Sequence, residues 1–171
     1  GPYSEYNPNG TIKAEGIYEF GKKNGNWTER FATGELKEQG TYQQDTLVGD
    51  WLFLYQNGNT RAKGSYLNGT KDSLGATGVP LYGREGKWLL YHENGKLSEE
   101  QHWKSGQAHG KRKIYFESGD LASLKSYTDG KLNGPYEKFY EQTTNGVVDA
   151  RYINEDGKYI GKYFTVASIS S

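Results

Sequence analysis

The clearest copy of a recurring pattern lies between residues 48 and 58, where an apolar run is followed by a polar turn pair. Aromatic and aliphatic residues fill positions 51–55, a composition typical of a β-strand. The pair Asn57-Gly58 follows and predicts a type I′ turn, because that turn needs positive φ at both central residues. A second strand is then expected over residues 60–66. The stretch therefore predicts one β-hairpin.

The same unit recurs along the chain with a period of 24 residues. A glycine opens each copy, and insertions of 13 and 3 residues account for the irregular spacings. We expect copies that start near residues 1, 25, 49, 86, 110 and 134 and together fill residues 1–163. Such a period is typical of repeat folds, in which each unit packs against its neighbours.

Several columns of the repeat have a physical meaning. A glycine fifteen residues after the opening one shares a strand face with the aromatic two positions later. It leaves room for a neighbouring ring to lie across the backbone. The positions that we expect to hold the repeat together are the first aromatic, the turn glycine and the second aromatic of each copy. They are Trp27, Trp51, Trp88, Tyr136, Gly34, Gly58, Gly95, Tyr42, Tyr66 and Trp103.

The later copies depart from this pattern. Arg112 replaces the first aromatic, and Gln101 and Lys125 replace the strand glycine. A second turn is expected between successive hairpins, where small or polar pairs reverse the chain. The pairs are Phe20-Gly21, Asn68-Gly69, Ser105-Gly106, Asp129-Gly130 and Asp156-Gly157.

The motif Gly-x-Trp-x-x-x-Tyr-x-Asn-Gly, followed by a Gly-x-Tyr strand, resembles the bacterial MORN-variant repeat, a family with antitoxin-like members. The resemblance extends over nearly the whole chain, from residue 1 to about residue 163. It implies an all-β fold, an elongated single-layer antiparallel sheet of tandem β-hairpins. Twelve or so strands at about 4.8 Å each would give a ribbon roughly 55–60 Å long.

Composition excludes several classes of protein. The hydrophobic fraction is 33%, below the usual level, but aromatic residues reach 15%, and disordered chains are poor in them. The net charge is zero, without the dense basic face that nucleic-acid binding requires. Cysteine is absent, so disulfides and thiolate metal sites are excluded. We expect no cofactor and no nucleic-acid partner.

The sequence also bears on the compartment. It holds no apolar run long enough to span a bilayer, so we expect no direct membrane insertion by this segment. Gly1-Pro2-Tyr3 recurs as Gly134-Pro135-Tyr136 in the same register. We therefore expect a native repeat at residue 1 and processing upstream, where a signal peptide or lipid anchor would have been lost. A bacterial periplasm or cell surface is favoured, and the cytoplasm if the protein is an antitoxin.

Catalytic and metal-binding constellations are sparse. His92 and His102 could face each other across a hairpin and hold zinc with Glu93 or Glu99. We favour a structural interpretation, because His92 occupies a position that is aromatic in other copies. The pair Glu99-Glu100 cannot share a site, since adjacent strand residues point to opposite faces. Residues 75–78 are rich in glycine but lack the lysine and helix of a phosphate loop. We expect no enzyme.

The 13-residue insertion within residues 70–83 is apolar for a loop. Insertions in repeat proteins often lie on the binding face. One interpretation is that Leu74, Val79, Leu81 and Tyr82 contact a partner, and the other is that the segment folds back over its own sheet. Residues 164–171 leave the repeat and are expected to form a tail or a capping strand.

Taken together, these features favour a protein-binding or scaffold module, since Tyr and Trp dominate interface energetics. The partner would be another protein, in a bacterial envelope or secretion-type complex. An antitoxin or immunity protein that neutralises a toxin is one alternative. A glycan-binding module, with rings that stack on sugars, is the other.

Overall fold

The computed structural model describes residues 1–75, 77–134, 136–139, 149–150, 152–155 and 158–161. These residues form β-strands and turns, and no helix occurs among them. Consequently, this part of the chain contains no helix that could cross a membrane. The strands are β1 (Pro2–Tyr6), β2 (Ile12–Glu19), β3 (Lys22–Arg30), β4 (Leu36–Gln43), β5 (Thr46–Leu54), β6 (Thr60–Gly69), β7 (Arg84–Tyr91), β8 (Leu97–Lys104), β9 (Gln107–Ala108), β10 (Gly110–Tyr115), β11 (Leu121–Thr128), β12 (Lys131–Leu132), β13 (Glu137–Phe139), β14 (Asp149–Ala150), β15 (Tyr152–Glu155) and β16 (Lys158–Gly161).

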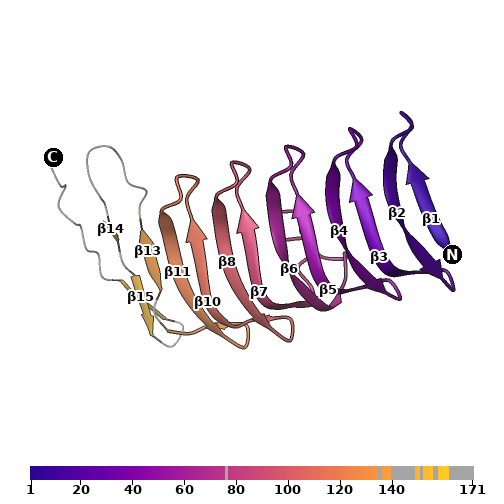
Figure 1. Cartoon of the computed structure of the whole chain (residues 1–171). Helices are drawn as coiled ribbons and strands as arrows, with labels where there is room; N and C mark the ends of the chain where they lie inside the picture. The colour runs from indigo at the N-terminus through magenta and orange to yellow at the C-terminus, as the bar shows by residue number, and fades with distance from the viewer. Residues whose placement is uncertain (76, 135, 140–148, 151, 156–157, 162–171) are drawn as a thin grey trace.

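Fourteen strands form one open antiparallel sheet. Its order is β1-β2-β3-β4-β5-β6-β7-β8-β10-β11-β13-β14, with β9 paired to β8 and β12 to β11, while β15 and β16 form a separate hairpin. Figure 1 shows the hairpins side by side in chain order, as an elongated ribbon of strands. The predicted all-β single-layer sheet of tandem hairpins is confirmed.

The turns at the two ends of the strands differ in type. At Asn57-Gly58 only the glycine has positive φ, 89°, and Gly58 N–H donates to Tyr55 O at 3.0 Å. This is a three-residue loop with a bulge at glycine, so the predicted type I′ turn there is wrong. Positive φ at both residues occurs instead at the other end of the strands. Those pairs are Phe20-Gly21, Gln44-Asp45, Ser105-Gly106 and Asp129-Gly130.

One predicted turn does not form, and another was missed. Asn68-Gly69 lies within β6, where the insertion begins, because the insertion takes the place of the turn. Leu67 N–H donates to Gly83 O at 2.9 Å, so the two ends of the insertion meet. The missed turn, Gln44-Asp45, carries no glycine to signal it. The predicted turn at Asp156-Gly157 and the tail at 164–171 lie outside the described residues.

Tryptophans on one hairpin lie over glycines of the preceding hairpin. A Cβ added to Gly40 would stand 2.1 Å from the Trp51 ring, and Gly16 and Gly64 have the same relation to Trp27 and Trp88. Each indole N–H then donates to the carbonyl after the glycine, as Trp51 Nε1 does to Thr41 O at 3.2 Å. Glycine is therefore required here for space, and each ring links two hairpins.

The core is a row of these tryptophans alternating with tyrosines. Successive rings meet edge to face with centroids 4.8–6.3 Å apart, a favoured arrangement of aromatic pairs. All the large residues of this row lie on one side of the sheet, which we call the aromatic face. The row runs through Tyr18, Trp27, Tyr42, Trp51, Tyr66 and Trp88.

The insertion packs on the aromatic face. Val79 is fully buried in the core cluster, and Tyr66 donates its hydroxyl hydrogen to Pro80 O at 2.6 Å. Lys71 contacts the buried carboxylate of Glu38 and lies 3.2 Å from Glu29. Burial would lower the pKa of Lys71, but these carboxylates raise it well above its ordinary value. The segment is thus a cover over its own sheet.

Candidate binding site on the polar face

Strand alternation places a second set of side chains opposite the aromatic face. The residues that flank each tryptophan point to this other side, which we call the polar face. They line a groove of about 730 Å³ across β3 to β7. The groove residues with side chains on this face are Asn26, Thr28, Gln39, Thr41, Asp50, Leu52, Lys63, Ser65, Lys87 and Leu89.

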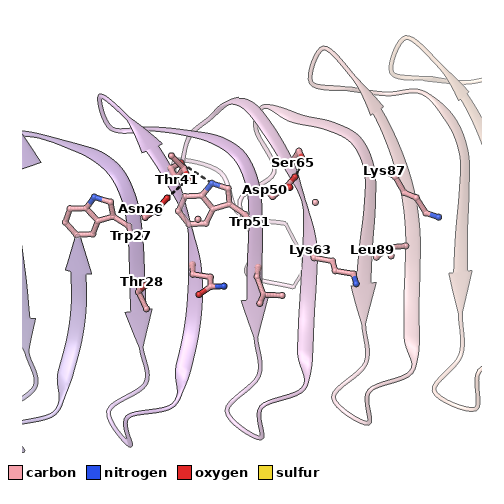
Figure 2. Close-up of a pocket in the computed structure, with 14 residues that line it drawn as sticks. Asn26, Trp27, Thr28, Thr41, Asp50, Trp51, Lys63, Ser65, Lys87 and Leu89 are labelled. Carbon is pink, nitrogen blue, oxygen red and sulfur yellow. Dashed lines mark hydrogen bonds between the residues drawn. The ribbon is translucent and has the colours of Figure 1, made fainter. Parts of the chain in front are cut away.

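The groove is polar and open along its length. Figure 2 shows the side chains of Thr28, Lys63 and Lys87 projecting from separate strands, with Trp51 extending toward Thr41. Thr41 donates its hydroxyl hydrogen to Asn26 Oδ1 at 3.0 Å. These hydroxyl and amide groups offer hydrogen-bond donors and acceptors to a ligand.

Charges of both signs lie along the groove. Ser65 donates to the carboxylate of Asp50, and Lys87 Nζ lies 3.5 Å from Glu100 on the next strand. Burial raises the pKa of Glu100, but the hydrogen bond with His102 and the nearby lysines outweigh this and lower it overall. Lys63 is exposed, with its Nζ 5.8 Å from the Tyr91 ring centre. The mixed charges suit a partner that is itself mixed in charge.

The four insertion residues predicted to contact a partner are divided by the structure. Leu74 and Tyr82 are 58% and 67% exposed, and Leu81 is half-buried. Val79 is fully buried, which corrects its assignment as a contact residue, because the core leaves no part of it at the surface. Leu74 and Tyr82 remain predictions for partner contact.

The histidines have separate partners. His92 donates from Nε2 to Tyr115 O, 2.9 Å away, and Tyr55 at the same repeat position donates to Tyr91 O at 2.7 Å. His102 Nε2 lies 3.2 Å from Glu100. Among the described residues, no group of three potential ligands is close enough to hold a metal ion. His92 thus occupies a linking position between neighbouring hairpins.

The repeat positions separate into rings and turns. Trp27, Trp51, Trp88, Tyr42 and Tyr66 are buried on the aromatic face. The turn glycines Gly34, Gly58 and Gly95 have positive φ of 102°, 89° and 87°. Trp103 packs partly buried against the core, and Tyr136 lies under the ammonium of Lys125, 4.7 Å from its ring centre.

The groove residues themselves were not singled out by the sequence. Their identities change between most copies, and only the column of Leu52 and Leu89 keeps one residue type in the groove. The available signal was the period-2 alternation beside each tryptophan, which assigns Asn26, Asp50 and Lys87 to the face away from the rings.

Comparison with known proteins identifies the repeat. Residues 1–19, 23–44, 84–105 and 108–129 each match the MORN repeat variant family. The matched segments coincide with hairpins whose aromatic and glycine columns are described above. A search of curated proteins finds no match. MORN repeats are generally non-catalytic modules that bind proteins or membranes. On its repeat pattern, its hairpin sheet and these four matches, the chain is a MORN-repeat protein.

Proposed function

We propose that this protein is a non-catalytic binding module that holds a protein partner along the groove of its polar face. The observation that carries the proposal is that the two faces of the sheet have different roles. The tryptophans and the insertion occupy the aromatic face, so that face is already used for packing. The polar face presents a groove of about 730 Å³ lined mainly by polar and charged side chains.

The shape of the groove favours an extended partner segment. It crosses five strands, β3 to β7, and strands are spaced about 4.8 Å apart, so its length is roughly 20 Å. A polypeptide of six or seven residues spans that distance when extended. Leu52 and Leu89 supply apolar contact within the polar lining. A small rigid metabolite would fill only part of such a surface.

Capture of the partner from the native host tests this proposal. Lys63→Glu reverses a charge at an exposed groove position and should reduce recovery of the co-purifying protein several-fold. Leu74→Glu is the matched control, because it introduces the same charge at an exposed position on the insertion. Loss of capture with Leu74→Glu and retention with Lys63→Glu would move the binding site to the insertion and contradict the groove.

The identity of the captured protein decides the biological setting. We propose a bacterial envelope or secretion-type complex, which places the protein in the periplasm or at the cell surface. Capture of a toxin would support instead the antitoxin or immunity function, with a cytoplasmic location. Cell fractionation of the native host tests the compartment directly.

Glycan stacking loses its main support in the structure. The rings of Trp27, Trp51 and Trp88 are 2%, 3% and 0% exposed, so sugars have no access to them. A glycan-binding site would therefore have to use exposed rings such as Tyr6, Phe20 and Tyr82 in place of these three indoles.

A further inference from the structure

A second cavity lies on the aromatic face, away from the groove. It measures about 280 Å³ and is enclosed by the insertion on one side and by β7, β8, β10 and β11 on the other. It lies where the row of tryptophans ends, because Arg112 occupies the position of the next tryptophan. The residues that face it include Thr77, Leu81, Arg84, Trp103, Arg112 and Tyr127.

Arg84 is a buried cation in this cavity. Its side chain is 1% exposed, and its guanidinium lies 4.5 Å from the ring centre of Trp88. Nε donates to Pro80 O at 3.0 Å, and Nη1 donates to Gln101 Oε1 at 2.8 Å. Both acceptors are neutral, and the ion pairs found among the described residues do not include Arg84. Burial lowers the pKa of Arg84, and the charge of nearby Glu99 offsets only part of this effect.

Arg112 and Thr77 bring further donors to the same space. Arg112 Nε donates to Glu99, and its guanidinium also interacts with the Tyr127 hydroxyl, so these two partners use part of its five N–H groups. The carboxylate of Glu99 also accepts from Gln101 Nε2 at 2.6 Å, so its charge is held by protein groups. The hydroxyl of Thr77 is buried and has no hydrogen-bond partner. Buried polar groups of this kind are nearly always paired, with protein, water or ligand.

We propose that this cavity binds a small organic carboxylate. The carboxylate accepts hydrogen bonds from Arg112 and Thr77, and its negative charge offsets that of Arg84. The apolar part of the molecule packs against Leu81, Leu90 and Trp103, which line the same cavity. Arginine and carboxylate form short, charge-assisted hydrogen bonds, and burial strengthens them.

The volume limits the size of the ligand. A cavity of about 280 Å³ corresponds to roughly nine water molecules at about 30 Å³ each. A monocarboxylate with one ring or a short branched chain fits this space. We choose benzoate as the probe, because benzamide has the same shape without the charge.

Isothermal titration of the full chain with benzoate and with benzamide, at matched ionic strength, tests the proposal. We expect saturable benzoate binding with a Kd below about 10 mM and at least tenfold weaker binding of benzamide. Arg112→Gln should weaken benzoate binding about tenfold or more, and Thr77→Val several-fold. Lys22→Glu, at an exposed position of β3 outside both the groove and the cavity, is the control and should leave benzoate binding unchanged.

Three results would overturn the carboxylate site: no saturable benzoate binding, equal affinity for benzoate and benzamide, or full affinity in both variants. Thr77→Val keeps the test valid if Arg112→Gln fails to fold, because Thr77 lies in the insertion and makes no hydrogen bond that the substitution would break. Benzoate should also raise the melting temperature of the wild-type chain, since a ligand that binds only the native state stabilises it.

Discussion

The two halves of the sheet fill the same repeat position in different ways. In the first half a tryptophan lies over a glycine of the preceding hairpin, as Trp51 does over Gly40. In the second half, Arg112 stands where the tryptophan would be, and Gln101 stands where the glycine would be. The next copy has Tyr136 and Lys125 in these positions, with the ammonium over the ring.

The comparison teaches that the two positions change together. An indole can lie flat on the sheet only where the backbone below has no side chain. Where the residue below has a side chain, as at Gln101, the position of the ring is occupied by Arg112. This longer polar residue contacts Glu99 instead. Antiparallel pairing continues through β10 and β11, but β8 and β10 pair at two positions, against five between β4 and β5. What is lost is aromatic packing, and the cavity beside Arg112 lies where that packing ends.

The largest expected effect comes from filling the space under a tryptophan. Gly40→Ala places a Cβ 2.1 Å from the Trp51 ring, which Tyr42 and Tyr66 hold from two sides. We expect a loss of at least about 3 kcal/mol in the free energy of unfolding, measured by urea denaturation. Lys125→Ala, in the same repeat position of the second half, should change it by less than about 1 kcal/mol. Equal losses in the two variants would show that the halves pack alike.

The insertion provides a second comparison, between buried and exposed apolar residues. Val79→Ala removes two methyl groups from a fully buried site, and we expect a loss of about 2 kcal/mol. Leu74→Ala, at a residue that is 58% exposed, should stay within about 0.5 kcal/mol. Thermal melting of both variants measures the difference. A negligible effect of Val79→Ala would mean that the insertion does not cover the sheet in solution.

The buried tyrosines of the first half predict a loss of stability in alkali. Burial raises the pKa of Tyr42 from 10.0 to about 12. Below pH 10 the phenol is protonated in both states, and its contribution is fully present. As the pH rises from 10 toward 12, the unfolded chain ionises first and the contribution is lost, amounting to about 1.4 kcal/mol at pH 11.

Tyr42→Phe should therefore flatten the fall in stability between pH 10 and 12, as measured by urea denaturation at each pH. An unchanged slope in Tyr42→Phe would argue that this phenol is hydrated in the native state.

The smallest expected effect is the coupling energy between positions 101 and 112. Gln101→Gly and Arg112→Trp together recreate the glycine and tryptophan pair of the first half. Each change alone should destabilise the chain, and the double variant should be more stable than their sum predicts by about 1 kcal/mol. Unfolding of all four chains in urea gives the coupling energy. Strictly additive changes in the free energy of unfolding would mean that the tryptophan and the glycine contribute to stability independently.

The sequence predicted the sheet because its main determinants are local. The aromatic strands, the turn glycines and the Gly16, Gly40 and Gly64 positions depend on residues within one or two hairpins. The type of each turn was harder to predict from the sequence. Gln44 and Asp45 adopt positive φ without a glycine, and this conformation depends on the twist of the flanking strands.

Tertiary packing decided the features that the sequence could not predict. The insertion could have lain on either face, and burial of Val79 against the aromatic row places it on one. The cavity depends on Arg84, Thr77 and Arg112, which are distant in the repeat pattern and belong to no shared motif. Apart from Leu52 and Leu89, the polar groove is built from residues that differ between copies, and a repeat pattern identifies only the residues that recur.

The central claim is that the aromatic face holds the fold and the polar face holds the partner. Photo-crosslinking in the native host tests it most directly, with a benzophenone amino acid placed at Gln39 in the groove or at Tyr82 on the exposed insertion. We predict a covalent adduct of one defined mass from position 39 and none of that mass from position 82. An adduct from position 82 with none from position 39 would contradict the claim.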